Sequence, residues 1–397
     1  MIANRVSFSI EMTDKAFITI VYHFSVYIVV YVTIITIMRV LSIFGTRPEA
    51  IKMCPLVREL EITKGIESLV CLTGQHREIL KQVIDIFGIS IDYDLDVMKP
   101  NQTLFDLTGN VLSGLEKVFE KEKPDIVLVH GDTTTSFTAA LAAFYQKIPV
   151  GHVEAGLRTY NKYSPYPEEI NRSLVSRIAD IHFAPTEVNK KNLAKEGIIK
   201  DVFVTGNTVV DAVKTIAEKN AVQKEKRLIL VTAHRRENWG EPLKQICHAI
   251  LQIREKFDDV EFIYPVHPNP EVRKIVNSLL DNQDRVLLTE PLDLREMYTL
   301  ISKSYLVLTD SGGLQEEVPV FDVPVLVLRT ETERPEAVDA GTVKVIGNET
   351  EKIVSASSEL LENKDAYEKM ANAVNPYGDG TASKQIVKYL LEWWDHR

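Results

Sequence analysis

The sequence predicts an α/β protein with two Rossmann-like domains whose parallel sheets face a central cleft. A chain of 397 residues exceeds what one hydrophobic core usually supports, and 45% apolar with 26% charged residues is typical of globular proteins. Downstream of Met38, short β-branched runs alternate with longer amphipathic stretches, which is the pattern of βαβ units in a parallel sheet. Polar strings directly follow many of these runs, at the strand ends where open α/β sheets bind ligands.

The apolar runs predicted as strands fall into two series, which we assign to two domains. The first series is RVLSIFG (39–45), SLVCLTG (68–74), DIVLVHG (125–131), PVGHVEA (149–155) and DIHFAP (180–185). The second is RLILVTAH (227–234), VEFIYPVH (260–267), RVLLTE (285–290), YLVLTD (305–310) and PVLVLR (324–329). Because DVFVTGN (201–207) can end the first series, we place the boundary near Gly206. The expected units are 38–205, 206–375 and a C-terminal helix, 376–397, that can cross back to the first domain.

Residues 1–37 form an apolar N-terminal extension with two competing interpretations. No Asp, Glu, Lys or Arg occurs from Ala16 to Met38, which is long enough for a membrane-spanning helix of about 20 residues. Taken alone, the run predicts a membrane anchor. The strand predicted at 39–45 follows without a spacer, however, and Met38 stands where a mature chain could begin. We therefore favour a wrongly assigned start codon, with a membrane as partner only if residues 1–37 are genuine.

Charge and cysteine distribution exclude several classes of function. The formal net charge of −10 argues against a nucleic-acid partner, which needs a basic surface. Cys54, Cys71 and Cys247 form no C-x-x-C pair, so we expect buried thiols, a reducing cytoplasmic compartment and no metal site. Neither a Walker A string nor G-x-G-x-x-G occurs, which disfavours a P-loop nucleotidase and a tightly held dinucleotide cofactor.

The string TDSGGLQEE (309–317) is the strongest predictor of a nucleotide site. Ser311, Gly312 and Gly313 lie at a predicted strand-to-helix turn, where bare backbone N–H groups and the positive helix end can hold a diphosphate. Glu317, about one turn further on, can accept hydrogen bonds from ribose hydroxyls. The alternative is a glycine-eased turn with an N-capping serine.

Cations follow the strands of both predicted domains. Arg47 and Lys52 in GTRPEAIKM can converge on a phosphate or on an acidic catalytic residue, unless they are simply a solvated helix start. The string TAHRREN adds His234, Arg235 and Arg236 from the second domain, and PVHPNP adds His267. For His267 a structural role is an equal alternative.

The candidate catalytic carboxylates come from the first domain. Asp132 in HGDTTT and Glu154 in HVEAGL follow neighbouring apolar runs, so we expect both in the cleft, where partial burial would raise their pKa into a useful range. N-capping by Asp132 and an ion pair of Glu154 are the alternatives. Glu168, in YSPYPEEINR, lies either on a Pro-rich lid loop or at a helix N-terminus.

The motifs together resemble the non-hydrolysing UDP-N-acetylglucosamine 2-epimerases, from Met38 to about Gly380. The matching strings are, in order, GTRPEAIKM, TGQHRE, HGDTTT, VEAGLRT, SPYPEEINR, TGNTVVDA, HRREN, TDSGGLQEE and TERPEA. The resemblance implies a glycosyltransferase-B-like fold, a homodimer, and reversible conversion of UDP-GlcNAc to UDP-ManNAc without a cofactor. It also implies elimination of UDP to a 2-acetamidoglucal and its re-addition on the other face.

The resemblance further implies a role for each candidate residue. The catalytic group is Asp132, Glu154 and Glu168, with His234 near the diphosphate. Uracil is placed against the loop TEPLDLREM, which contains the expected contact residue Leu292, largely through backbone. Residues near Leu294 and Met297 differ from the aromatic ones common in the family. The expected UDP-sugar contacts are Arg47, Lys52, Ser311, Gly312, Gly313, Glu317 and Arg334. The implied activating second site for UDP-GlcNAc comprises Gln75, His76 and Arg77 with Arg235 or Arg236.

Three rival functions are compatible with the predicted fold. A glycosyltransferase or a hydrolysing epimerase would use the same UDP site but pass the sugar to an acceptor or to water. A catalytically silent nucleotide-sugar sensor would have no need for carboxylates facing its ligand. The joint presence of Asp132, Glu154 and Glu168 therefore favours the epimerase.

Overall fold

The computed structural model describes residues 37–74, 77–98, 102–217 and 227–397, and these ranges form two parallel sheets. The first sheet has strand order β3-β2-β1-β4-β5-β6-β7 and the second β10-β9-β8-β11-β12-β13, with parallel pairing throughout. The predicted α/β class with two parallel sheets is confirmed. The strands are β1 Met38–Phe44, β2 Ile66–Leu72, β3 Tyr93–Asp94, β4 Ile126–His130, β5 Val150–Val153, β6 Ile181–Ala184, β7 Val202–Val204, β8 Arg227–Thr232, β9 Val260–Pro265, β10 Val286–Thr289, β11 Leu306–Thr309, β12 Val325–Val327 and β13 Val343–Val345.

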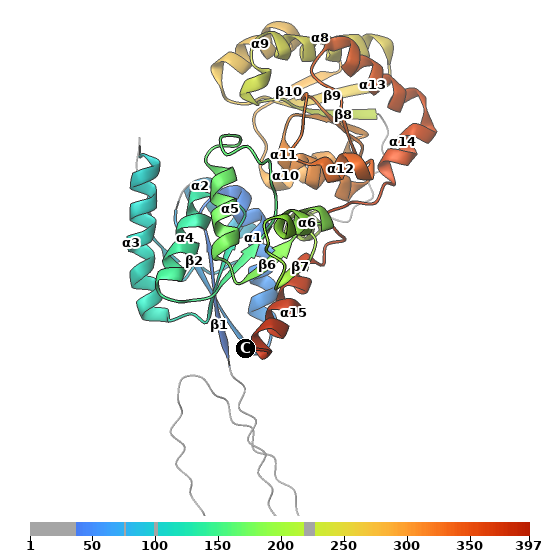
Figure 1. Ribbon diagram of the computed structural model, residues 1–397. Coiled ribbons are helices and arrows are strands. Elements are labelled where there is room, and N and C mark those ends of the chain that lie inside the picture. The colour runs from blue at the N-terminus through green and yellow to red at the C-terminus, as the bar shows by residue number, and fades with distance from the viewer. Residues whose placement is uncertain (1–36, 75–76, 99–101, 218–226) are drawn as a thin grey trace, which may run out of the picture.

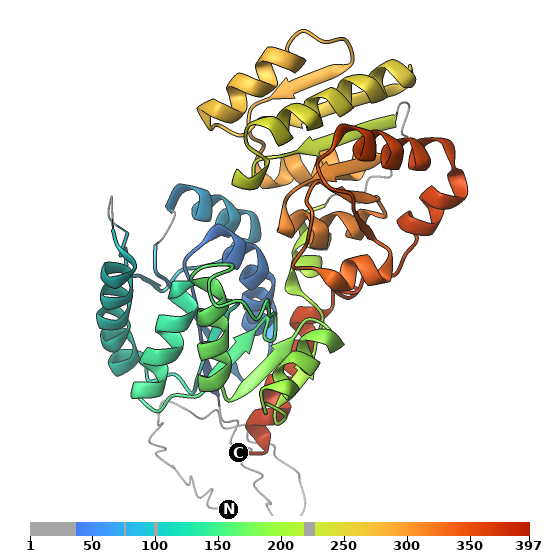
Figure 2. The same ribbon diagram turned by 45° about the horizontal axis from the view of Figure 1, so that its top comes forward.

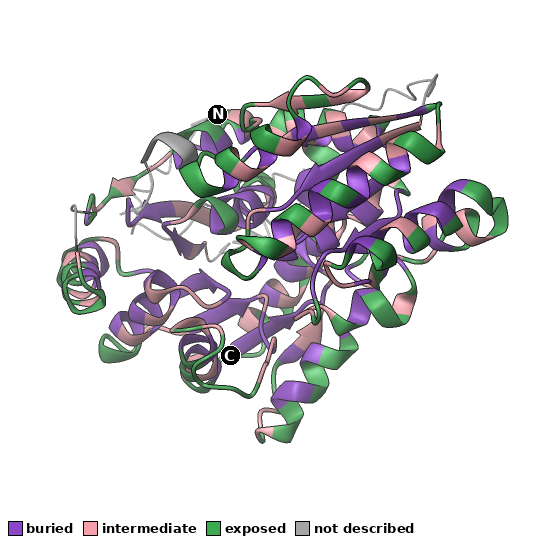
Figure 3. Ribbon diagram, turned by 90° about the horizontal axis from the view of Figure 1, so that it is seen from above, coloured by how far each residue is buried: buried purple, intermediate pink, exposed green. Residues whose placement is uncertain are grey.

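Helices connect successive strands and cover the sheets, so the central strands are buried on both faces, as Figure 3 shows. The helices of the first half are α1 Arg47–Ile62, α2 Arg77–Phe87, α3 Leu104–Glu122, α4 Thr134–Tyr145, α5 Glu168–Ile178, α6 Glu187–Lys195 and α7 Thr208–Ile216. Those of the second half are η1 Arg236–Asn238, α8 Glu241–Lys256, α9 Pro270–Leu280, α10 Leu294–Lys303, α11 Gly312–Glu317, η2 Val318–Phe321, α12 Pro335–Ala340, α13 Thr350–Glu362, α14 Lys364–Ala371 and α15 Ala382–Asp395.

Two short strands, β3 and β13, were not predicted from the sequence. They contain only two and three residues, so neither shows a periodicity that could reveal it. β3 extends the first sheet beyond β2, and β13 closes the second sheet beyond β12. Their edge positions leave the central strands, which carry the predicted site loops, unchanged.

Helix α7 lies between the two halves. It contacts α1 of the first half as well as α10 and α11 of the second. Its buried residues Val209 and Val213 belong to one apolar cluster that also contains Val40 of β1 and Val307 of β11. Burial of apolar surface is therefore continuous from one sheet to the other, which favours a defined arrangement of the two halves.

The chain crosses back to the first half after α14, as Figures 1 and 2 show. There α15 packs beside α1 and α7. The first turn of α15 is capped from a different helix: Asp211 of α7 accepts hydrogen bonds from Ala382 N at 3.1 Å and Ser383 N at 2.8 Å. Thr381, at the N-cap itself, makes no side-chain cap hydrogen bond. A carboxylate at this helix end satisfies backbone donors and interacts favourably with the helix dipole.

The three cysteines are buried and unpaired, as predicted from their spacing: Cys54, Cys71 and Cys247 are each 0% exposed. No helix in the described ranges combines the length and the apolar character needed to cross a bilayer. The N-terminal extension 1–37, proposed as an anchor or start-site artefact, lies outside the described residues except for Ile37, so neither interpretation of it is tested.

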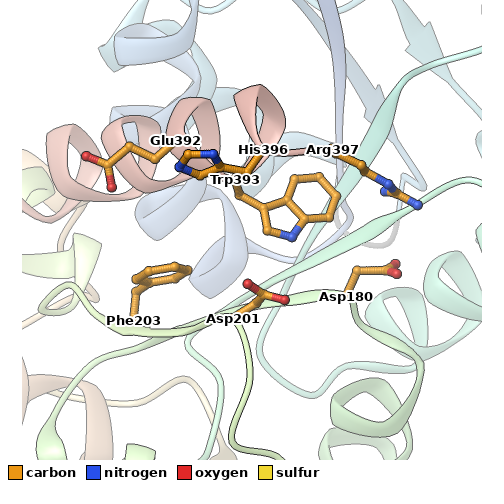
Figure 4. Close-up of a pocket in the computed structure, with 7 residues that line it drawn as sticks. All are labelled: Asp180, Asp201, Phe203, Glu392, Trp393, His396 and Arg397. Atoms are coloured by element: carbon orange, nitrogen blue, oxygen red, sulfur yellow. The ribbon is translucent and has the colours of Figure 1, made fainter.

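A hollow of about 470 Å³ lies between α15 and the first sheet, as Figure 4 shows. Asp180 and Asp201, which line it, immediately precede strands β6 and β7, so the hollow opens at the amino edge of the sheet. Trp393 of α15 and Arg397, two residues beyond the end of that helix, form its opposite wall, with the guanidinium 4.9 Å from the ring centroid. It therefore lies at the edge opposite to the polar strand-end loops.

Replacement of Asp211 should test whether the return of α15 contributes to stability. We expect Asp211→Ala to lower the free energy of unfolding by about 1–2 kcal/mol, because two buried N–H groups lose their acceptor. Urea denaturation followed by circular dichroism measures the change. Asp395→Ala, at an exposed position in the last turn of the same helix, is the control and should leave the midpoint unchanged. Equal effects of the two variants would contradict the capping role.

Candidate active site

The predicted site residues lie at the carboxyl ends of central strands in both sheets. Asp132 follows β4 and Glu154 directly follows β5, its neighbour in the first sheet. His234 follows β8 and Ser311 follows β11, again neighbours in the second sheet. The polar strings therefore lie where the doubly wound topology places ligand sites.

A buried cluster of two acids and two bases joins the halves. Lys52 of α1 forms ion pairs with Glu154 and with Glu316 of α11, the latter at 2.9 Å from Nζ to Oε2. Glu316 also pairs with Arg334, the N-cap residue of α12. The exposed fractions of the four side chains are 11%, 9%, 1% and 16%. Of the alternatives left open for Lys52, the structure has the contact with an acidic residue, and for Glu154 it has the ion pair.

The expectation that burial raises the pKa of Glu154 is wrong. Burial favours the neutral carboxyl, but the cations Lys52 and Arg334 outweigh it and hold the pKa well below its ordinary value of 4.5. Desolvation lowers the pKa of Lys52, but Glu154 and Glu316 outweigh it and raise that pKa above its usual range. His130 is buried and its pKa is lowered mainly by desolvation, so it stays neutral 3.8 Å from Glu154 Oε2.

The backbone at Glu154 has an unusual conformation that aims its side chain into the cluster. Its φ of 61° lies in the left-handed region, which non-glycine residues rarely adopt. A Cβ at Gly131, on the neighbouring strand end, would lie 3.2 Å from Glu154 Oε2, so this position has little room for a side chain. Local strain and close packing thus accompany a fixed carboxylate.

Asp132 and Glu168 are brought together through helix α5. Arg172 forms an ion pair with Asp132, and Asn171 Nδ2 donates to the Asp132 carbonyl at 2.9 Å. Glu168 begins the same helix four residues before Arg172, so both side chains share one face. Of the two alternatives for Glu168, the structure has the helix N-terminus rather than the loop.

The two adjacent glutamates of α5 have different roles. Glu169 is structural: it accepts backbone hydrogen bonds from Thr159 at 3.0 Å and Tyr160 at 2.8 Å, and it contacts Arg172. Glu168 Oε2, in contrast, is a buried atom without a hydrogen-bond partner among the described residues. An unsatisfied carboxylate oxygen at the start of the helix that contacts Asp132 can accept a proton or a ligand hydroxyl.

Asp310 organises the loops of the second sheet. It is fully buried and accepts hydrogen bonds from His234 N and Arg235 N, both at 2.8 Å, and from Asn238 Nδ2 at 3.0 Å. His234 Nδ1 lies 3.3 Å from its other oxygen, and the ring stacks on His267 at 5.6 Å between centroids. Burial lowers the pKa of His234, which favours the neutral imidazole.

The SGG turn has the features expected of a phosphate cradle. Ser311 makes no side-chain cap hydrogen bond to α11, so the N-capping alternative is not observed. A Cβ on Gly312 would stand 3.7 Å from an Arg235 guanidinium nitrogen, and one on Gly313 would stand 3.2 Å from Glu317 Oε1. Burial and the adjacent Glu316 raise the pKa of Glu317 to about 7.

The remaining predicted contacts lie further apart. Arg47 is exposed at the start of α1 and lines a cavity of about 360 Å³ with Asp293 and Leu294. Leu292 instead lines a hollow over β10 and α10. In the proposed second site Arg235 and Arg236 are exposed. Gln75 and His76 of the same proposed site lie outside the described residues, and so does the side chain of Arg77.

Sequence reasoning missed four residues that organise the site: Asn207, Arg172, Asp310 and Glu316. Asp310 and Glu316 adjoin the candidates Ser311 and Glu317, and Arg172 shares α5 with Glu168, whereas Asn207 has no candidate residue beside it. Their signal would have been burial of a polar residue at a strand or helix end, which the sequence alone does not reveal.

Comparison with known proteins agrees with this arrangement. The sequence model of the family UDP-N-acetylglucosamine 2-epimerase matches residues 58–391. The chain belongs to that family. A UDP-N-acetylglucosamine 2-epimerase of Neisseria meningitidis is 54% identical over 370 residues, covering 89% of this chain and 100% of the relative. One from Bacillus subtilis is 52% identical over 367 residues, covering 91% and 97%.

Solved structures extend the comparison with the 2-epimerases. The Neisseria meningitidis UDP-GlcNAc 2-epimerase bound to UDP-GlcNAc superposes with a TM-score of 0.82 at 54% identity, covering 89% of this chain and 100% of that one. The Methanocaldococcus jannaschii enzyme in complex with UDP-GlcNAc and UDP has a TM-score of 0.73 at 37% identity, covering 89% and 100%. The resemblance inferred from the motifs is thus confirmed at the level of family and fold.

Replacement of Lys52 should test the electrostatic role of the cluster of Lys52, Glu154, Glu316 and Arg334 in this protein. We expect Lys52→Met to lower the free energy of unfolding by about 3–5 kcal/mol near neutral pH, because two buried carboxylates lose their shared cation. Guanidinium denaturation at several pH values measures it.

The difference in stability between the wild type and Lys52→Met should depend on pH. In the wild type, the depressed pKa of Glu154 contributes stability that is present above 4.5 and is lost as pH falls. In Lys52→Met the unpaired carboxyl should titrate above 4.5, so that the variant loses stability as pH rises. The stability gap must therefore widen between about pH 5 and pH 8. A gap that stays constant over this range would contradict the ion-pair assignment.

Proposed function

We propose that this chain reversibly converts UDP-N-acetylglucosamine to UDP-N-acetylmannosamine by inverting C2 of the sugar. The observation that carries the proposal is the gathering of carboxylates and cations at facing strand ends, in a chain of the 2-epimerase family. The 54% identical Neisseria structure, bound to UDP-GlcNAc, supports the choice of substrate.

The chemistry follows from the low acidity of the C2 proton. We infer that a carboxylate removes this proton while the C1–O bond breaks and UDP leaves with the electron pair, giving a 2-acetamidoglucal. Re-addition of UDP at C1, with protonation of C2 from the opposite face, yields the epimer. No net oxidation occurs, so the reaction needs no hydride cofactor, and its demands are acid/base groups and stabilisation of the leaving diphosphate.

The carboxylates of the first sheet are assigned to proton transfer. The depressed pKa of Glu154 keeps it ionised, and the buried Glu168 oxygen lacks a partner among the described residues. Asp132 is oriented by Arg172. Asp132, Glu154 and Glu168 thus form the proposed acid/base group. More than one such residue is needed because C2 loses its proton on one face and regains one on the other.

The second sheet is assigned to the nucleotide. The Ser311, Gly312 and Gly313 turn offers backbone N–H groups to the diphosphate, with His234 beside it, and Glu317 accepts from the ribose hydroxyls. Uracil lies against the loop that contains Leu292. The other proposed contacts are the cations Arg47, Lys52 and Arg334.

The same proposal extends to organisation and role in the cell. The domains are 38–205 and 206–375, with 376–397 returning to the first, and two copies form a homodimer. UDP-GlcNAc also acts as an activator at a second site formed by Gln75, His76, Arg77, Arg235 and Arg236. The product supplies ManNAc for surface polysaccharide synthesis.

Proton NMR of UDP-GlcNAc incubated with the protein in deuterated water tests the reaction. We expect deuterium at C2 of both epimers, because the removed proton exchanges with solvent before re-addition, and a trace of 2-acetamidoglucal. Asp132→Asn should reduce turnover by at least about 10²-fold while UDP still binds. Free ManNAc accumulating from UDP-GlcNAc would instead identify a hydrolase, and transfer to an added acceptor sugar a glycosyltransferase.

The raised pKa of Glu317 predicts pH-dependent substrate binding. A carboxylate accepts two hydrogen bonds from ribose hydroxyls better than a neutral carboxyl, and the ionised fraction grows as pH passes about 7. We expect the Kd for UDP-GlcNAc to fall roughly tenfold between about pH 6 and pH 8, as measured by calorimetry. Glu317→Gln should bind weakly and without this pH dependence. If the variant retains the wild-type slope, Glu317 is not the titrating group.

A further inference from the structure

Asn207 lies where the two connections between the halves run side by side. Its backbone N–H donates to the Tyr377 carbonyl at 2.8 Å, which joins the segment before α7 to the segment before α15. Gly206 has a φ of 82°, and a Cβ there would stand 2.9 Å from the same carbonyl oxygen, so the approach requires glycine. The side chain of Asn207, 3% exposed, is held at this junction.

The side chain of Asn207 has a defined orientation. As the N-cap of α7, its Oδ1 accepts a hydrogen bond from Val209 N at 3.0 Å. Because this bond identifies the oxygen, the amide nitrogen must face the opposite way. There Nδ2 donates to Glu154 Oε1 at 2.9 Å and lies 3.4 Å from Glu316 Oε2. One amide thus touches a carboxylate from each half.

We propose that Asn207 is a positioning residue that makes the orientation of Glu154 depend on the relative placement of the two sheets. The inference rests on the proposed function, because Glu154 matters as an acid/base group only if the chain is an epimerase. Asn207 cannot hold both carboxylates unless the junction brings α11 to the end of β5. Separation of the halves would remove Glu316 from the amide and leave Glu154 in a different set of contacts.

The charged and titratable groups around Glu154 determine what a substitution of Asn207 would do. Lys52 approaches from α1, His130 from β4 and Arg334 from the start of α12. Glu316 pairs with both cations, and Tyr377 interacts with Arg334 and Glu154. Asn207→Asp keeps an N-capping oxygen but removes both amide donors and adds a negative charge. The added charge favours protonation of Glu154 and so raises its pKa.

Two substitutions at position 207 and one control separate positioning from stability. Ser caps helices well, so Asn207→Ser should retain nearly the wild-type midpoint of thermal unfolding. Asp caps equally well, but in Asn207→Asp its buried charge lies beside Glu154 and Glu316 and should lower the midpoint. Asn363→Asp makes the same change at the exposed N-cap of α14, where the side chain accepts from Ala366 N at 3.1 Å. The measurements are kcat and KM for UDP-GlcNAc across a range of pH.

For Asn207→Asp we expect kcat to fall roughly tenfold or more, with KM changed far less, because the lost hydrogen bond acts on the reacting carboxylate. The acidic limb of the kcat profile should move up by about one pH unit. Asn207→Ser should lower kcat without this added charge, and so with a smaller shift of the limb. Asn363→Asp should match the wild type.

The outcomes distinguish this inference from the function on which it rests. A wild-type protein that interconverts the epimers, together with an Asn207→Asp variant of unchanged kcat and unchanged acidic limb, would overturn the positioning role alone. Equal limb shifts in Asn207→Asp and Asn363→Asp would overturn it as well, since the effect would then be non-local. A wild-type protein without epimerase activity would overturn the proposed function itself.

Discussion

The arrangement of the two halves depends on a buried ion cluster of Lys52, Glu154, Glu316 and Arg334. Burying charges is costly, and only close pairing with opposite charges offsets the loss of hydration. Its two acids and two bases compensate one another, and they come from α1, the end of β5, α11 and the start of α12. A well-packed apolar contact would stabilise the junction as well or better, so the cluster contributes orientation more than net stability.

The topology of both sheets explains why the cluster forms where the site loops lie. In each sheet the strand order reverses between two adjacent strands. These are β1 and β4 in the first sheet, and β8 and β11 in the second. Loops leave such a switch point in opposite directions and open a crevice between them. Arg47 and Asp132 follow the first pair, and His234 and Ser311 follow the second. The two sheets therefore present chemically different side chains at equivalent switch points, and the cluster of Lys52, Glu154, Glu316 and Arg334 joins the two halves.

The sequence predicted the location of this site better than its electrostatics. Strands with long β-branched runs, such as RLILVTAH, were found with the polar strings at their ends, because both signals are local. The pKa of Glu154 was predicted in the wrong direction, because Lys52 is 102 residues away along the chain and its contact follows only from the fold. Asn207 was missed for the same reason, since an N-cap residue shows no sign in sequence of a second, distant partner. Short edge strands such as β13 escaped because they lack periodicity.

The compensation within the cluster limits how a diphosphate can be bound. Lys52 and Arg334 are each committed to carboxylates in the absence of ligand, so neither can meet a phosphate at full strength without weakening an existing ion pair. On the proposed function, an incoming diphosphate competes with Glu154 and Glu316 for the same cations. A diphosphate that binds Lys52 weakens the ion pair that depresses the pKa of Glu154. A carboxylate with a higher pKa is a stronger base. Substrate binding would thus raise the basicity of the carboxylate beside the sugar, which links nucleotide recognition on one sheet to proton transfer on the other.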